Sequence, residues 1–144
     1  MYTHVKKVVV RGAFETVVDR LKSELFNDGF EVGGITDFQN PTSRCQVTHT
    51  KHKVLSVFYG FLYKEMITQS PFAGIVFPCV VSVIELYPGE IAIFSHNATE
   101  HIARAMSLDS IENLAKQVGK RLDDVIHVLE NTQNKYPDLV TSWG

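Results

Sequence analysis

The stretch GIVFPCVVSVIEL, Gly74 to Leu86, is the most apolar run in this chain, and the rest of the fold can be built outward from it. Successive side chains of a strand point to opposite faces, so a strand with one face in water alternates apolar and polar residues. Here one face would carry Ile75, Phe77, Cys79, Val81 and Val83, and the other Val76, Val80, Ile84 and Leu86, with Ser82 among them. Both faces are apolar, which predicts a central strand that is covered on both sides.

A proline interrupts this run, immediately before a cysteine. Pro78 has no N–H to donate to a neighbouring strand, so within a central strand it is expected at a bulge. A bulge redirects the side chains beside it and often borders a functional site. Cys79 is therefore either a small buried core residue, the usual fate of a free cysteine, or a thiol turned toward a cleft.

The periodicity of the flanking sequence predicts a mixture of strands and helices. In chain order we first expect a strand over His4–Arg11, a helix from Phe14 that stops at Gly29, a strand over Phe30–Phe38 and a polar loop over Asn40–His52. A strand over Lys53–Tyr59, which Gly60 breaks, and a helix over Phe61–Thr68 should follow. The remainder should contain strands over Gly74–Leu86 and Glu90–Ser95 joined by Pro88-Gly89, a short helix after Asn97, and a long helix from Asp109 with an apolar stripe from Ile111 to Leu129.

This order favours an α+β fold, a two-layer sandwich with a mainly antiparallel sheet and helices packed on one face. Residues 1–144 are expected to form a single domain, with 132–144 as a candidate extended tail. Two long amphipathic helices can cover one face of such a sheet. The other face then needs a second subunit, a ligand or the loop over Asn40–His52, because a large apolar patch in water is unusual for a monomer.

Composition excludes several classes of function. The net charge of −2 argues against a nucleic-acid-binding surface, which needs clustered lysine and arginine. The N-terminus lacks an apolar stretch long enough for a secretory signal, and no run is long enough to span a membrane. Without an export signal, Cys45 and Cys79 are expected to be free thiols in a reducing cytoplasm. The protein is predicted to be cytoplasmic.

Six histidines raise the question of a metal site. Cys45, His49 and His52 form the pattern C-x3-H-x2-H in the polar segment, and thiolate and imidazole are good ligands for zinc. No second ligand pair lies nearby, so a solvated loop is the preferred interpretation, and neither a metal nor a cofactor is predicted. A metal or haem protein remains a third, weaker interpretation.

Two further histidines and one carboxylate flank the suspected site. His96 ends the hairpin strand, and the helix start after Asn97, with His101, would favour an anion. A histidine beside Cys79 could lower the thiol pKa and create a nucleophile, although surface or capping histidines are the simpler alternative. Asp37 stands at a strand end in apolar surroundings, where it is either part of this site or a turn-capping carboxylate.

Three segments together resemble a known family. They are LFNDGFEVGGITDFQ (25–39), HKVLSVFYGFLYKEMI (52–67) and IVFPCVVSVIEL (75–86), followed by the hairpin and the amphipathic helix. They resemble the domain of unknown function 302 family, from about Phe14 to Leu129. The resemblance implies a two-layer domain that commonly self-associates and has no assigned activity. The family pattern points to Asp37 and Cys79 as the positions most worth testing.

The chain also departs from the family pattern, as a divergent member would. Phe58, Tyr59 and Gly60 stand where the family has a small residue, asparagine and proline, and Val80 stands where asparagine usually follows the Pro-Cys pair. The Asp-Pro expected after the hairpin is Asn97-Ala98 in this chain.

No phosphate-binding loop, dinucleotide fingerprint, nucleophile elbow or zinc-protease motif occurs in the sequence. The leading hypothesis is therefore a non-catalytic, homodimeric domain that binds a small ligand or a partner. The alternative is a thiol-dependent enzyme or redox sensor that uses Cys79 in a cleft with His96 or Asp37. The residues predicted to line the site are Asp37, Tyr59, Pro78, Cys79, His96 and His101.

Overall fold

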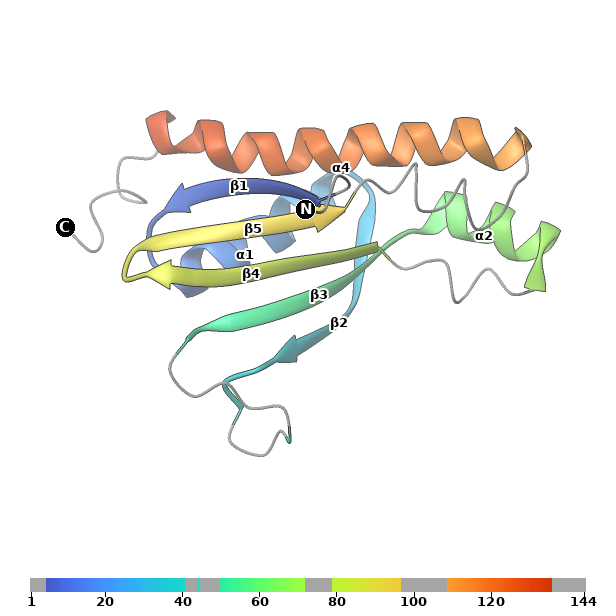
Figure 1. Ribbon diagram of the computed structural model, residues 1–144. Coiled ribbons are helices and arrows are strands. Elements are labelled where there is room, and N and C mark those ends of the chain that lie inside the picture. Colours follow the sequence, from blue (N-terminus) through green and yellow to red (C-terminus); the bar gives the residue numbers. More distant parts are fainter. Residues whose placement is uncertain (1–4, 41–43, 45–49, 72–78, 97–108, 136–144) are drawn as a thin grey trace.

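The structure is a computed structural model that describes residues 5–40, 44, 50–71, 79–96 and 109–135 (Figure 1). Its elements, in chain order, are β1 (Val5–Arg11), α1 (Phe14–Asn27), β2 (Phe30–Asp37), β3 (His52–Tyr59), α2 (Gly60–Gln69), β4 (Cys79–Tyr87), β5 (Glu90–His96) and α4 (Asp109–Lys135).

The strands form one five-stranded sheet in the order β1-β5-β4-β3-β2, and every neighbouring pair is antiparallel. The predicted central strand, β4, is the middle strand. It pairs with β5 through the predicted hairpin, in which Gly89 has a φ of 81°, a conformation that favours glycine. The first and second strands of the chain, β1 and β2, form the two edges.

One face of the sheet is covered by helices (Figure 1). The predicted apolar stripe of α1 is buried in full, and α1 ends where Gly29 adopts a φ of 94°. The described part of the α4 stripe, from Val118 to Leu129, is buried in the same core. Helices on one face of an antiparallel sheet confirm the predicted α+β class.

The two faces of β4 differ in their surroundings. Cys79, Val81 and Val83 are buried beneath the helices, at 2% exposure or less. Val80, on the opposite face, remains 40% exposed. Among the described helices, α2 contacts this second face at one end of the sheet, where Tyr63 packs on Phe58 of β3. The sequence predicted that the helices would leave this side of the strand uncovered.

Some predicted boundaries need correction. Gly60 does not merely end β3 but is the first residue of α2, and His52 belongs to β3 rather than to the preceding loop. The candidate tail begins later than predicted, because α4 extends to Lys135. Residues 136–144, the strand start over 74–78 with its proposed bulge at Pro78, and the short helix after Asn97 lie outside the described residues.

Register shifts occur at two places in the sheet. One lies between Val32 and Gly34 in β2, and the other lies between Glu85 and Tyr87 in β4. Among the described helices, none combines the length and the hydropathy that crossing a membrane requires.

The helix layer should be essential for stability. Leu21 on α1 is completely buried, so Leu21→Ala is expected to lower the free energy of unfolding by about 3 kcal/mol, through lost burial and a cavity. Lys22→Ala is the matched control on the same helix, with an expected change within about 0.5 kcal/mol. Urea denaturation measures both, and equal effects of the two substitutions would contradict this packing.

Candidate functional site

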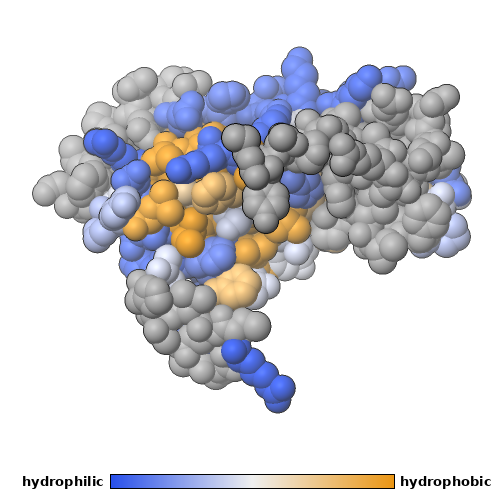
Figure 2. Space-filling model, in the orientation of Figure 1, coloured by the Kyte–Doolittle hydropathy of each residue, from blue (hydrophilic) through white to orange (hydrophobic). Residues whose placement is uncertain are grey.

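The face of the sheet opposite the helices carries exposed apolar side chains from several strands. We call it the open face. Directly paired residues of antiparallel strands share a face, so the register assigns its members. The apolar members are Val5, Val9, Val54, Phe58, Val80, Ile84, Ala92 and Phe94. Figure 2 shows apolar side chains gathered on this face, with hydrophilic ones among them and around them.

The apolar surface is continuous across the strands. Val9 pairs with Ala92, and Ala92 pairs with Ile84, so one apolar row crosses β1, β5 and β4. Ala92 is completely buried, although it lies on the open face, because it is small and flanked by larger side chains. The next row contains Phe94, over whose ring the Lys7 ammonium lies 5.9 Å from the centroid.

A shallow hollow of about 190 Å³ lies within the open face. Its lining includes Val5, Val80, Ser82, Phe94 and His96. This lining is almost entirely apolar in its exposed surface, and Val80 is its most open member in the central strand, at 40% exposure. Such a hollow can accept an apolar side chain from another surface.

A glycine extends the open face across β2. A Cβ atom at Gly33 would lie 2.5 Å from Cε2 of Phe58, so any side chain at this position would require the Phe58 ring to move. Gly33 therefore allows the Phe58 ring to lie over β2. The far side of this ring makes an edge-on contact with Tyr63 of α2, at 5.6 Å between centroids.

One polar cluster interrupts the open face. The His52 ring shares a hydrogen bond of 2.8 Å with the Ser82 hydroxyl and stacks on Phe38 at 4.8 Å. Partial burial lowers the pKa of His52 from its usual value of 6.5. Of the predicted C-x3-H-x2-H set, Cys45 and His49 lie outside the described residues. The described residues contain no group of three metal-ligating side chains.

The structure places Cys79 in the core. Its side chain is 2% exposed beneath the helices, and burial raises the pKa of the thiol to about 12. Val5 pairs with His96 on the open face, so His96 and Cys79 are on opposite sides of the sheet. This arrangement favours the interpretation of Cys79 as a core residue over that of a nucleophile activated by His96.

Asp37 is remote from Cys79 as well. Asp37 pairs with Lys53, whereas Cys79 pairs with Val57, four residues further along β3, or about 13 Å. Oδ1 of Asp37 instead accepts a hydrogen bond of 2.9 Å from the backbone N–H of Gln39. This is the turn-capping role that the sequence analysis offered as the alternative.

Of the predicted site residues, Tyr59 does lie near Cys79. Val57 is the partner of Cys79 in β3, and Tyr59 is two positions beyond it, on the same face of the sheet. Its ring packs on Phe30 at 5.1 Å and lies beneath the Arg121 guanidinium at 5.5 Å, so it joins β3 to α4. Pro78 and His101 lie outside the described residues. The four described residues therefore do not converge on one cleft.

The site analysis from sequence missed the open-face residues of the flanking strands. Phe58 in β3 and Ala92 and Phe94 in β5 extend the apolar face that was recognised only in β4. A signal was present, because VLSVFY and IAIF are also apolar at both odd and even positions. Applying the two-face test to each strand would have found them.

Comparison with known proteins identifies a family model and a solved structure that are similar to this chain. The model of the family described as "Domain of unknown function DUF302" matches residues 6–129. A crystal structure of an uncharacterized conserved DUF302 protein from Bacillus stearothermophilus superposes with a TM-score of 0.73 at 18% identity, and the match covers 88% of this chain and 98% of that one. At this identity the likeness extends to the fold alone. No curated protein matches.

Thiol labelling tests the state of Cys79. In a Cys45→Ser variant at pH 8, we expect Cys79 to react with a disulfide reagent about a thousandfold more slowly than a free thiol, because raising the pKa from 9.0 to about 12 removes thiolate by that factor. Labelling in denaturant should be complete. Reaction at the free-thiol rate without denaturant would restore the nucleophile interpretation.

A titration of His52 tests the polar cluster. Its pKa is lowered in the folded state, so the unfolded chain binds the proton more readily, and stability is lost as the pH falls below 6.5. We expect the NMR titration midpoint of His52 to lie below 6.5. We also expect the melting temperature of His52→Gln to fall less than that of wild type between pH 7 and pH 5. A midpoint at or above 6.5 would contradict this burial.

Proposed function

This chain belongs to the DUF302 family, and from that premise we propose that it is a non-catalytic interaction domain that forms a homodimer through its open face. The observation that carries the proposal is the apolar row across β1, β5 and β4, with Phe94 and Val80 beside it, on the face opposite the helices. Apolar surface removed from water contributes about 25 cal/mol per Å². A surface of this kind gains free energy when another apolar surface covers it.

The size of the open face suits a second copy of the chain. Five strands spaced about 4.8 Å apart and about eight residues long give a footprint of about 600 Å², before the relief of the side chains is counted. Stable interfaces bury about 800 Å² per partner. The open face would supply the apolar centre of such an interface, and the surrounding charged residues Lys7, Arg11, Glu31 and Glu90 its polar rim.

The geometry of two sheets also fits a symmetric pair. Sheets pack face to face about 10 Å apart, with their side chains interdigitating. A twofold axis between two open faces buries the same patch on both subunits, so no apolar surface is left to extend the assembly. In this arrangement the hollow beside Val80 would receive a side chain from the partner.

The placement of the predicted catalytic groups supports a role without catalysis. Cys79 is buried under the helices, and Asp37 caps a turn at the other end of the sheet. His96 is on the open face. A thiol-dependent site would require these groups to meet. We also propose a cytoplasmic setting, which the unpaired thiol of Cys79 supports.

Two matched substitutions test the dimer. Val80 on the open face and Val128 on α4 are exposed to nearly the same extent, 40% and 39%. A charge at position 80 would be buried without a partner in the dimer, so Val80→Glu should weaken association by about 3 kcal/mol, more than a hundredfold in Kd. Val128→Glu should leave the Kd unchanged. Sedimentation velocity from 1 to 100 μM measures all three proteins.

A wild-type chain that stays monomeric throughout this range would refute the dimer. Dissociation by Val128→Glu, with Val80→Glu still dimeric, would instead move the interface to the helix layer. Circular dichroism of both variants separates a loss of association from a loss of folding.

A further inference from the structure

A second feature lies on the other side of the sheet, where polar residues interrupt the core between β1 and α4. On the helix-facing side of β1, Val10 is buried and Val8 packs against the core, but the next residue on that side is Lys6. Its partner in β5 is Ser95, which is only 5% exposed and follows Ile91 and Ile93 on the same face. Two polar groups thus occupy positions at which this layer is otherwise apolar.

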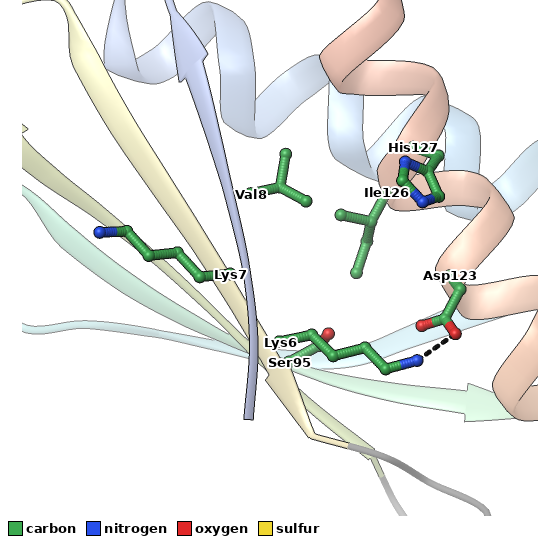
Figure 3. Close-up of a pocket in the computed structure, with 7 residues that line it drawn as sticks. All are labelled: Lys6, Lys7, Val8, Ser95, Asp123, Ile126 and His127. Atoms are coloured by element: carbon green, nitrogen blue, oxygen red, sulfur yellow. Dashed lines mark hydrogen bonds and ion pairs between the residues drawn. The ribbon is translucent and has the colours of Figure 1, made fainter. Parts of the chain in front are cut away.

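Helix α4 supplies the facing wall. The Lys6 ammonium forms an ion pair with Asp123, and the close-up view shows Lys6 reaching from β1 toward α4 (Figure 3). One turn further along α4, Ile126 points toward Val8, and His127 follows it (Figure 3). The side chain of Lys7 leaves β1 in the opposite direction, toward the open face (Figure 3).

A cavity of about 280 Å³ lies among these residues. Its lining is Lys6, Lys7, Val8, Ser95, Asp123, Ile126 and His127. Val8 and Ile126 provide apolar surface, and Lys6 and Ser95 provide polar groups beside it. Sites for small molecules characteristically combine an apolar lining with a few polar groups that fix orientation. At about 30 Å³ per water molecule in the liquid, this volume equals that of about nine waters.

We propose that this cavity binds a small organic carboxylate. The ligand carboxylate would accept hydrogen bonds from the Lys6 ammonium and the Ser95 hydroxyl, and its apolar body would pack on Val8 and Ile126. The chemistry of Lys6 gives the charge preference. An ammonium has three N–H donors, and the ion pair with Asp123 occupies one of them while holding the chain toward the cavity. Asp123 also lines the cavity and balances the charge of Lys6, so the preference for a carboxylate rests on the N–H donors of the ammonium that the ion pair leaves open and on the Ser95 hydroxyl.

The inference is independent of the proposed dimer, because the cavity lies on the helix side of the sheet and the dimer would use the open face. Carboxylate binding and self-association can therefore succeed or fail separately. Cys79 is buried in the core and does not belong to the lining of the cavity.

Sodium benzoate is a suitable probe, since it has nine non-hydrogen atoms and a single carboxylate. In a ¹H–¹⁵N NMR titration at pH 7 and constant ionic strength, we expect saturable shifts at the amides of Val8, Ser95, Ile126 and His127. The expected Kd is on the order of 1 mM for a ligand of this size. Benzamide, the neutral analogue, and benzylamine, the cationic one, should each bind at least tenfold more weakly.

A lysine outside the cavity lining provides the control. Lys6→Met removes the ammonium that faces the cavity and should weaken benzoate binding at least tenfold, whereas Lys22→Met, on α1 and outside the lining, should change the Kd by less than twofold. If Lys6→Met does not fold, Ser95→Ala takes its place, with an expected weakening of about threefold. The proposal is overturned if benzoate causes no saturable shifts, if benzamide or benzylamine binds as well, or if the variant that replaces the ammonium or the hydroxyl binds as wild type does.

Discussion

The central strand of the sheet is apolar on both faces, but helices cover one face alone. This difference between the two faces is the main constraint on the molecule. β4 supplies Val81 and Val83 to the core and Val80 and Ile84 to the open face. Burial of the first set holds α1 and α4 against the sheet. The second set has the same chemical character, so the hydrophobic effect that stabilises the fold also favours covering the opposite side. The fold, and the self-association that we propose, thus depend on the same strand.

The fold was largely predictable because its signals are local. The stripe of α1 from Phe14 to Leu25, the Pro88-Gly89 turn and the doubly apolar β4 each require only a short window of sequence. The misplaced boundaries have physical reasons as well. Gly60 has open space where a side chain would be, so nothing prevents α2 from beginning there, and His52 is held in β3 by a hydrogen bond to Ser82.

The candidate site was much less predictable, because it depends on which face each residue occupies. His96 and Cys79 are close to a common sheet end, but alternation turns one to the open face and the other into the core. Asp37 and Cys79 are separated by strand register, which no spacing in the sequence encodes. Lys6 likewise pairs with Ser95 and forms an ion pair with Asp123, and both partners are far from Lys6 in the sequence.

The strand order also governs when the sheet can be completed. β1 precedes the other described strands in the chain, yet among them it pairs with β5 alone, with Val5 opposite His96. Contacts between segments so distant in sequence slow folding, because a long loop must close before they form. During synthesis, β1 must therefore wait for the hairpin to emerge before its edge can pair.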